Sequence, residues 1–293
     1  MRIASNKLHD LIAFYNSELS SLYEQSELNA LIQQVFKYYL GFSSADISVK
    51  KNENINQSDV LKLYDCCKEL KKNIPLQYIL GETVFFGLTF KVNSKVLIPR
   101  PETEELVEII LKDYRNKSET TLDILDIGTG SGCIPITLKN KLPDANISAI
   151  DISQEALQVA QQNAMINNST VLFNYCDILK PEAEYVLDTY DIIVSNPPYI
   201  SKNEGSQMHD RVKNNEPGIA LFVEDINPII FYKRIVELCK HHLNSCGALY
   251  FELNPVYAEE IKQLAQKISL FAEVFLIKDL SGNIRFLKAL KHE

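Results

Sequence analysis

Several features that mark membrane, secreted and nucleic-acid-binding proteins are missing from this 293-residue chain. No run of about 18 or more apolar residues occurs, and no basic segment followed by an apolar one stands at the start. We therefore expect a cytoplasmic protein with no membrane partner. The formal net charge is -8 and the isoelectric point is about 5.3. Because duplex nucleic acids usually demand an overall basic surface, we expect no direct contact with nucleic acid.

Sequence support for a metal site or a disulfide framework is also missing. The chain has six cysteines, but no two of them stand in a C-x-x-C arrangement. We therefore expect no bound metal and interpret the cysteines as reduced, partly buried thiols. They are Cys66, Cys67, Cys133, Cys176, Cys239 and Cys246.

The first 82 residues have the apolar periodicity of helices. Three series lie at residues 8–15, 28–36 and 60–70. Gly41 follows the second series and is typical of the residue that ends a helix. We interpret residues 1–82 as a small helical domain that serves either as a scaffold or as a docking surface for a partner. The third series opens with Val60, Leu61 and Tyr64.

Residues 83–98 are richer in β-forming residues. Two short runs of such residues flank Gly87, which predicts a β-hairpin connector between two domains. Two prolines then lead into a helix predicted over residues 102–112. The connector divides the helical domain from a larger domain, residues 99–293.

In the larger domain, short apolar runs alternate with helical segments. Strands separated by helices imply a parallel sheet with helices on both faces. The last two strands are close in sequence, so we expect an antiparallel hairpin at one edge of the sheet. A helix over 133–142 and a second one, capped by Ser153 and ending near residue 166, fall between the strands. The predicted strands are residues 122–125, 147–150, 171–175, 190–194, 248–252, 273–277 and 284–289.

A glycine-rich loop follows the first strand of this domain and opens a helix. Glycines let the backbone turn tightly and approach a ligand closely. A dinucleotide site favours G-x-G-x-x-G, with pyrophosphate at the helix N-terminus. Here the spacing is G-x-G-x-G, and Asp126 before the loop would repel a pyrophosphate. The pattern favours S-adenosylmethionine, which carries an ammonium and a sulfonium. The loop residues are Gly128, Thr129, Gly130, Ser131 and Gly132.

Two acids follow the next two strands. Asp151 ends the second strand, where a carboxylate can accept both ribose hydroxyls of an adenosine. NAD and S-adenosylmethionine share this feature, and a helix-capping acid is the alternative. Asp177 follows the third strand and could accept from the adenine amino group, or it could be a surface acid in a turn.

The segment Asn196-Pro197-Pro198-Tyr199 directly follows the strand at residues 190–194, at the ligand-binding edge of the predicted sheet. Neither proline donates an N–H, so the segment is a rigid loop with free carbonyls rather than a central strand. The Asn196 side-chain oxygen and the Pro197 carbonyl could each accept one N–H of a planar nitrogen, on which Tyr199 could stack. These contacts would fix a weakly nucleophilic nitrogen for displacement at a methyl carbon. A structural Pro-Pro turn is the alternative.

Together these motifs resemble the peptide chain release factor glutamine methyltransferases, the PrmC or HemK family, over nearly the whole chain. The stretch Arg100-Pro101-Glu102-Thr103-Glu104 is the most discriminating part of the resemblance. Asn-Pro-Pro-Tyr alone is shared with adenine-N6 and guanine-N2 methyltransferases. Other matching segments are residues 75–81, 86–88, 96–99, 216–217, 220–221 and 279–282 with Arg285.

The resemblance implies an α/β fold, in which a small all-α N-terminal domain precedes a seven-stranded, Rossmann-like methyltransferase domain dependent on S-adenosylmethionine. It implies N5-methylation of the glutamine in the Gly-Gly-Gln motif of class I release factors, which supports translation termination and yields S-adenosylhomocysteine. The helical domain would contact the release factor, and we expect a monomer. By matching position, the cofactor would contact Gly128 to Gly132, Asp151, Asp177, Ile178 and Asn196. The glutamine would be held by Asn196, Pro197, Pro198 and Tyr199, with Asn196, Pro197 and Tyr199 as the catalytic residues.

Several features of the sequence allow more than one interpretation. Ile178 stands where relatives often have an aromatic residue beside the adenine. Arg100 and Glu102 either close over the cofactor or form a salt-bridged start of a helix. A nucleic-acid base methyltransferase is a second possible function, which the acidic charge opposes. A non-catalytic protein that binds S-adenosylmethionine is a third, which the intact Asn196–Tyr199 segment opposes.

Overall fold

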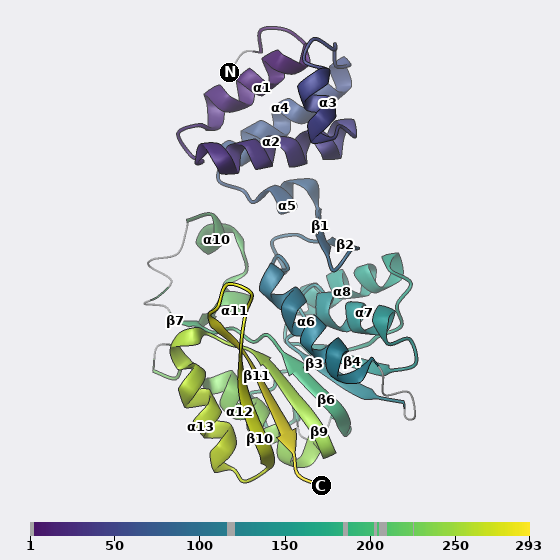
Figure 1. Ribbon diagram of the computed structural model, residues 1–293, viewed down its shortest axis with the longest axis vertical. Helices are drawn as coiled ribbons and strands as arrows, with labels where there is room; N and C mark the ends of the chain where they lie inside the picture. Colours follow the sequence, from purple (N-terminus) through teal and green to yellow (C-terminus); the bar gives the residue numbers. More distant parts are fainter. Residues whose placement is uncertain (1–2, 116–120, 184–186, 202–203, 205–209, 225) are drawn as a thin grey trace. The chain divides into compact units, whose positions relative to one another are not determined.

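The computed structural model describes residues 3–115, 121–183, 187–201, 204, 210–224 and 226–293. The chain divides into two compact units (Figure 1). The helical unit comprises residues 1–80 and 210–215, and the sheet unit comprises residues 81–209 and 216–293.

The helical unit packs short helices around one apolar core. As expected, α2 ends at Gly41, whose φ of +69° is the left-handed conformation that glycine favours. The prediction that Leu61 opens the buried face of the third helix is wrong, because Leu61 is 58% exposed. The buried stripe of α4 starts at Leu63 and continues one and two turns later, at Cys66, Cys67 and Leu70. The helices are α1 (Leu8–Leu19), α2 (Gln25–Leu40), α3 (Ser44–Val49), α4 (Gln57–Lys71), α5 (Leu76–Leu80) and α10 (Asp210–Asn215).

Helix α10 belongs to the helical unit although it is distant from the other helices in sequence. The Arg211 guanidinium lies 2.6 Å from a carboxylate oxygen of Glu27 and 4.0 Å from the centre of the Tyr23 ring. The Asn215 side chain donates to the carbonyl of Asn73 at 3.0 Å. Contacts of this range in sequence leave no trace in local periodicity, so the sequence does not predict them.

The sheet unit begins with a β-hairpin around Gly87, where the sequence predicts one; its strands belong to this unit. Its two-residue turn consists of Phe86 and Gly87, whose positive φ values of +50° and +78° suit the twist of an antiparallel pair. The side chain of Asn163, on helix α8 (Gln154–Ile166), both accepts from the Lys91 amide at 2.6 Å and donates to the Lys91 carbonyl at 3.0 Å, which holds the hairpin on that helix. The strands are β1 (Glu82–Phe85) and β2 (Leu88–Lys91).

The centre of this unit is a seven-stranded sheet in the order β10-β11-β9-β6-β3-β4-β5. The five strands from β9 to β5 are parallel, and β11 is antiparallel to both β9 and β10, so the predicted edge hairpin is confirmed. The strands are β3 (Asp123–Ile127), β4 (Asn146–Asp151), β5 (Leu172–Tyr175), β6 (Tyr190–Ser195), β9 (Leu243–Glu252), β10 (Phe271–Lys278) and β11 (Ile284–Lys291). A separate parallel pair is formed by β7 (Ile200–Ser201) and β8 (Phe222–Val223).

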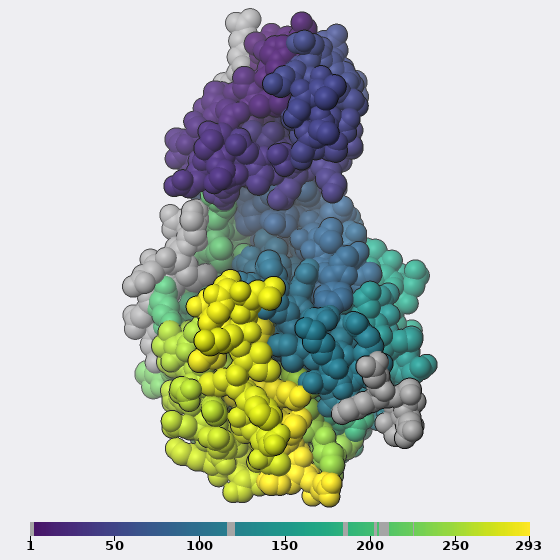
Figure 2. All heavy atoms as spheres, in the orientation of Figure 1, coloured from purple at the N-terminus to yellow at the C-terminus, as the bar shows by residue number. Residues whose placement is uncertain are grey.

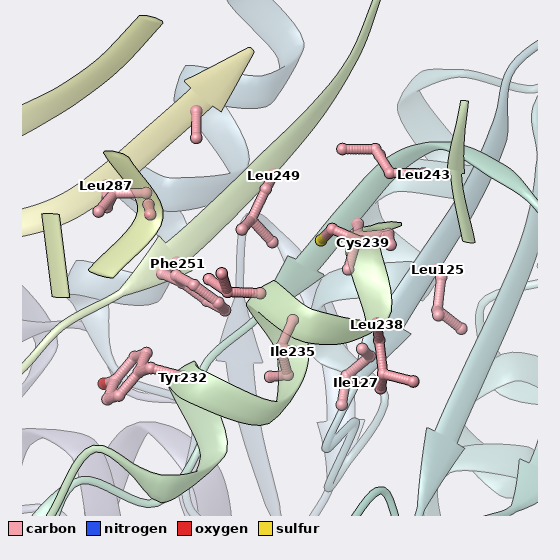
Figure 3. Close-up of a cluster of buried hydrophobic side chains, with 14 of the residues drawn as sticks. Leu125, Ile127, Tyr232, Ile235, Leu238, Cys239, Leu243, Leu249, Phe251 and Leu287 are labelled. Atoms are coloured by element: carbon pink, nitrogen blue, oxygen red, sulfur yellow. The ribbon is translucent and has the colours of Figure 1, made fainter. Parts of the chain in front are cut away.

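Helices cover both faces of the sheet, as predicted (Figure 1). Neighbouring residues of β3 point to opposite faces: Ile124 packs in the core under α6 and α7, and Leu125 packs in the core under α12 and α13. Figure 3 shows the second core, where Tyr232, Ile235 and Leu238 of α12 face side chains of the strands. The helices are α6 (Pro101–Tyr114), α7 (Cys133–Lys141), α8 (Gln154–Ile166), α11 (Gly218–Leu221), α12 (Ile230–His242) and α13 (Ala258–Lys267), with a 3-10 turn at Pro255–Tyr257.

The C-terminal hairpin of β10 and β11 reaches the surface beside α6. Figure 2 shows its yellow atoms next to the blue atoms of that helix. At the tip, the Leu280 amide donates to a carboxylate oxygen of Glu105 at 2.9 Å. Across the described ranges, no helix is both long and apolar enough to cross a membrane.

Candidate active site

The glycine-rich loop leaves the carboxyl end of β3 and is held by the neighbouring strand. The amides of Gly128 and Thr129 both donate to the Ile150 carbonyl, at 2.9 and 3.0 Å. A Cβ atom added at Gly128 would meet no atom within 4 Å, so the backbone there faces open space. A Cβ at Gly132 would lie only 2.9 Å from a methyl of Ile136. A Cβ at Gly132 would also lie 3.1 Å from the Cβ of Ala160 on α8. Gly128 therefore leaves room for a ligand, whereas Gly132 lets the start of α7 approach α8 closely.

Asp126 is a fully buried carboxyl just before this loop. Neither of its oxygens has a hydrogen-bond partner in the described part of the chain. Burial raises the pKa of the Asp126 carboxyl to about 7, the nearby Thr129 hydroxyl lowers it in part, and the Asp151 carboxylate raises it further. A buried carboxyl without partners is costly, so the position is suited to a group that arrives from outside the chain.

Asp151 fastens the loop from the end of β4. One of its oxygens accepts from the Gly130 amide at 2.8 Å, and the other accepts from the Ser153 amide at 2.9 Å. The cap of α8 is Ser153 itself, whose hydroxyl accepts from the Ala156 amide at 3.1 Å. Burial raises the pKa of Asp151, and the hydrogen bonds that its carboxylate accepts from backbone amides lower the pKa in part. Each carboxylate oxygen keeps a further lone pair for a ligand hydroxyl.

A pocket with mostly apolar walls opens between the carboxyl ends of β3, β4, β5 and β6. Its polar side chains include Asp151 and Asp177, and one oxygen of Asp177 already accepts from the Leu179 amide at 3.1 Å. Of the predicted contact residues, six line this pocket: Gly128, Asp151, Asp177, Ile178, Pro197 and Pro198. The lining also includes Ile127, Ile150, Ile152, Cys176, Leu179, Ser195, Ile219 and Phe231. The predicted residues outside the lining are Thr129, Gly130, Ser131, Gly132, Asn196 and Tyr199.

The Asn196 side chain is held by Thr103, which is itself hydrogen-bonded to Glu252. Its Nδ2 donates to the Thr103 hydroxyl, on α6, at 3.2 Å. The Thr103 hydroxyl donates in turn to Glu252, at the end of β9, over 2.7 Å. The Asn196 side-chain oxygen and the Pro197 carbonyl take part in no hydrogen bond with the residues that the structure describes. These two oxygens are therefore free acceptors beside the pocket wall.

Tyr199 is anchored to the same carboxylate. Its hydroxyl donates to the second oxygen of Glu252 at 3.3 Å, and Asn254 donates to the Tyr199 carbonyl at 3.1 Å. Burial raises the pKa of Tyr199 well above its usual range. Burial also raises the pKa of Glu252 to about 7, although the Thr103 hydroxyl, the Arg285 charge and the Tyr199 hydroxyl lower it. The fully buried carboxyls of Asp126 and Glu252 thus hold their protons more strongly than ordinary carboxyls do.

Arg100 forms an ion pair away from the pocket lining. Its guanidinium lies 2.6 Å from Glu216, a buried acid whose other oxygen accepts from the Ile98 amide at 3.3 Å. Arg100 is also the residue that precedes helix α6. Of the two alternatives for Arg100, closure over the cofactor or a salt-bridged start of a helix, the geometry matches the second. The partner of Arg100 in the ion pair is Glu216, from a distant segment of the chain.

Two family profiles match successive parts of the chain. A family profile described as the PrmC N-terminal domain matches residues 10–81, and one described as the methyltransferase small domain matches residues 103–215. The chain is 41% identical to a release factor glutamine methyltransferase of Flavobacterium psychrophilum, over 92% of this chain and 94% of that protein. The chain belongs to the release factor glutamine methyltransferase family. The protein of that name from Bacteroides thetaiotaomicron is 39% identical over 96% of this chain and 99% of its own length.

Solved structures of methyltransferases share the fold of this family member. A methyltransferase from Pyrococcus furiosus covers 81% of this chain and all of its own, with a TM-score of 0.52 and 20% sequence identity. Likeness at that identity concerns the fold alone. The seven-stranded, Rossmann-like architecture expected from the sequence is thereby confirmed, and the structure adds the order of the strands.

Two residues of this site were not assigned a role from the sequence. Thr103 lay within the most discriminating motif of the family, but its partners are 93 and 149 positions away in the chain. Glu252 offered one usable signal, because it directly follows the apolar run 248–251 at the end of a predicted parallel strand. Phe231 and Ile219 of the pocket lining follow no motif, and nothing in the sequence pattern places them there.

Proposed function

We propose that this member of the release factor glutamine methyltransferase family methylates the side-chain amide N5 of the glutamine in the Gly-Gly-Gln motif of class I peptide chain release factors. The methyl donor is S-adenosylmethionine and the product S-adenosylhomocysteine. The observation that carries the proposal is the pair of free acceptors, the Asn196 side-chain oxygen and the Pro197 carbonyl, beside the pocket at the carboxyl ends of β3, β4, β5 and β6. The curated relatives, which match nearly the full length of the chain, support the same substrate by name.

The residues at the ends of β3 and β4 fit the methyl donor. S-adenosylmethionine supplies an electrophilic methyl group on a sulfonium. The unpartnered carboxyl of Asp126 suits the cationic end of that molecule, and the open space at Gly128 allows close approach. Asp151 holds lone pairs for the ribose hydroxyls, and Ile178 with Asp177 lines the wall expected at the adenine.

The segment at the end of β6 fits the acceptor. An amide nitrogen is a weak nucleophile because its lone pair is delocalised, so catalysis depends on positioning. The Asn196 oxygen and the Pro197 carbonyl each accept one N–H of the substrate amide, which fixes its nitrogen and favours pyramidal geometry. Tyr199, with its hydroxyl held by Glu252, provides a fixed ring beside the planar group.

The helical unit is the proposed contact surface for the release factor. In this proposal the protein acts as a cytoplasmic monomer, with neither nucleic acid nor membrane as a partner. The helical unit buries its own apolar core and has an independent compact structure, which suits a module that binds a protein. Its matching family profile is the N-terminal domain of the same family.

One labelling assay tests the substrate. The protein is incubated with S-adenosylmethionine tritiated at the methyl group and with purified release factor, the same factor carrying Gln→Ala at the tip of its Gly-Gly-Gln motif, or tRNA. We expect label on the unmodified release factor only. Peptide mapping should place it on the tip glutamine.

Label on tRNA and none on the release factor would overturn the proposal in favour of a base methyltransferase. No label on any of them, together with calorimetric binding of S-adenosylmethionine, would instead identify a protein that binds the donor without using it. An Asn140→Ala variant, altered at an exposed asparagine of α7, serves as the matched control and should label the release factor normally.

A further inference from the structure

Glu252 and Thr103 form a hydrogen-bond relay behind the Asn196 side chain. Both are buried, with 1% and 3% of their surface exposed. They come from β9 and α6, and neither belongs to the segment that faces the pocket. Their hydrogen bonds nevertheless reach both Asn196 and Tyr199, at opposite ends of that segment.

The chemistry of the relay fixes the direction of each hydrogen bond. An ionised carboxylate can only accept hydrogen bonds, so the single O–H of Thr103 must donate to Glu252. The Thr103 oxygen is then left with lone pairs alone and can only accept from Asn196. The amide of Asn196 therefore has its NH2 group toward Thr103, and its oxygen is the end left for a substrate.

The orientation of Asn196 matters because a substrate amide also has two ends. An NH2 group donates, whereas a carbonyl oxygen accepts. With its oxygen free, Asn196 accepts from the nitrogen end of a side-chain amide, and the Pro197 carbonyl accepts the second N–H. With its NH2 group free, Asn196 would instead bind the oxygen end and leave the wrong atom beside the donor.

We propose that Glu252 and Thr103 are positioning residues that hold the Asn196 amide with its oxygen toward the substrate, and thereby select the nitrogen end of a side-chain amide over its oxygen end. This inference rests on the proposed function, because it takes a side-chain amide as the group that is bound. It assigns a task to two buried polar residues that contact neither the pocket nor, in the proposal above, the substrate.

The charges around Glu252 set the pH range in which the relay operates. Burial raises the pKa of Glu252 to about 7, with the charge of Glu102 on α6 acting in the same direction. Arg285 on β11 lowers it, but this guanidinium also lies 3.6 Å from Asp279. From α12, the Tyr232 hydroxyl donates to the backbone carbonyl of Glu252 at 3.0 Å. Glu252 is thus ionised, and the relay fully directed, above neutral pH.

Substitution of Thr103 tests the relay by kinetics. In Thr103→Val the methyl group replaces the hydroxyl at nearly constant volume, so Asn196 is free to turn over. We expect kcat for release factor methylation to fall about tenfold while KM does not rise, because reversed binding is non-productive rather than weak. The affinity for S-adenosylmethionine should stay within about twofold. Thr103→Ser keeps the hydroxyl and should restore kcat to within about threefold of the unmodified protein.

Thr137→Val is the matched control, because Thr137 is fully buried on α7 and its hydroxyl has no partner in the described chain. It should leave kcat unchanged. An unchanged kcat in Thr103→Val would overturn the inference. A raised KM together with weaker cofactor binding would also overturn it, because it would show that the substitution disturbs the whole site rather than the orientation of Asn196. Glu252→Gln provides a second arm. We expect kcat of the unmodified protein to rise between about pH 6 and 8, as Glu252 ionises, and kcat of Glu252→Gln to stay level over that range. A rise that persists in Glu252→Gln would overturn the assignment of the pH dependence to this relay.

A readout independent of catalysis separates this inference from the proposed function. In the unmodified protein, the side-chain NH2 signal of Asn196, assigned by its loss in Asn196→Ala, should exchange slowly with solvent in NMR spectra. In Thr103→Val it should exchange at least about tenfold faster. Equal exchange in both proteins would overturn the relay even if release factors are methylated. Faster exchange without any methylation of release factors would overturn the proposed substrate instead.

Discussion

The two halves of the site treat their buried polar groups in opposite ways. In the half proposed to bind the cofactor (the cofactor half), which comprises Asp126, Asp151 and residues 128–132, a buried carboxyl has no hydrogen-bond partner in the described chain, and the backbone at Gly128 and Gly130 faces open space. In the transfer half, which comprises Thr103, Glu252 and residues 196–199, the buried carboxyl of Glu252 accepts hydrogen bonds from two hydroxyls. If the cofactor half binds the methyl donor as proposed, the ligand would supply the partner that the Asp126 carboxyl does not find within the described chain. In the transfer half, the side chains of Thr103, Glu252 and Tyr199 already have partners within the described chain, and the Asn196 side-chain oxygen and the Pro197 carbonyl have none there.

The largest expected effect comes from removing one of these acceptors. Asn196→Ala deletes the side-chain oxygen proposed to bind the substrate N–H. We expect the rate of methyl transfer to the release factor to fall by at least about 10²-fold, because positioned hydrogen bonds at a reacting group contribute on that scale. Single-turnover labelling at saturating cofactor measures the loss. A rate within about threefold of the unmodified protein would show that Asn196 does not hold the reacting amide.

The cofactor half should show the opposite pattern. Asp126→Asn removes the buried charge proposed to meet the cationic end of the donor, and we expect the affinity for S-adenosylmethionine to fall about 10²-fold. The ligand-free variant should nevertheless be more stable above pH 7, by on the order of 1–3 kcal/mol, since it avoids an unpaired buried carboxylate. Urea denaturation at pH 8 and calorimetry measure the two effects.

Asp144→Asn, at an exposed acid, is the control for charge alone. If Asp126→Asn weakened the fold at pH 8 and left cofactor affinity unchanged, the contrast between the two halves would fail, because Asp126 would then have a structural partner.

A third prediction concerns the pH dependence of stability. The pKa values of Asp126 and Glu252 are raised from 3.8 and 4.5 to about 7 in the folded protein. The folded state therefore holds more protons than the unfolded chain between these values, and stability falls as pH rises through that range. We expect the free energy of unfolding, relative to the double variant Asp126→Asn/Glu252→Gln, to be higher at pH 5.5 than at pH 8. The same difference at both pH values would contradict the burial-raised pKa values.

The smallest effect is expected at the weaker hydrogen bond of the transfer half. Tyr199→Phe keeps the ring but removes the hydroxyl that lies 3.3 Å from Glu252. We expect kcat to fall about three- to tenfold with cofactor affinity unchanged. Tyr175→Phe, altered at a half-exposed tyrosine on β5, should have no effect. A loss of kcat as large as that of Asn196→Ala would contradict this prediction. It would mean that the Tyr199 hydroxyl takes a direct part in methyl transfer rather than only holding the ring.

Sequence patterns predicted the parts of this molecule that depend on local order. The strand and helix periods of residues 121–293 led to the observed sheet, and Gly41 ended the helix where expected. Leu61 was misplaced because a shift of one residue rotates a helical position by about 100°. The relay through Thr103 and Glu252 was missed because it joins residues 149 positions apart, and only the folded sheet brings their elements together.

The most direct test of the account is calorimetric titration of the Asn196→Ala protein with S-adenosylmethionine. If Asn196 serves the transfer half, the dissociation constant should stay within about tenfold of the unmodified value, or about 1.4 kcal/mol, although methyl transfer is lost. A loss of cofactor affinity well beyond tenfold would contradict the account, because Asn196 would then belong to the cofactor half and the two halves would not be separate.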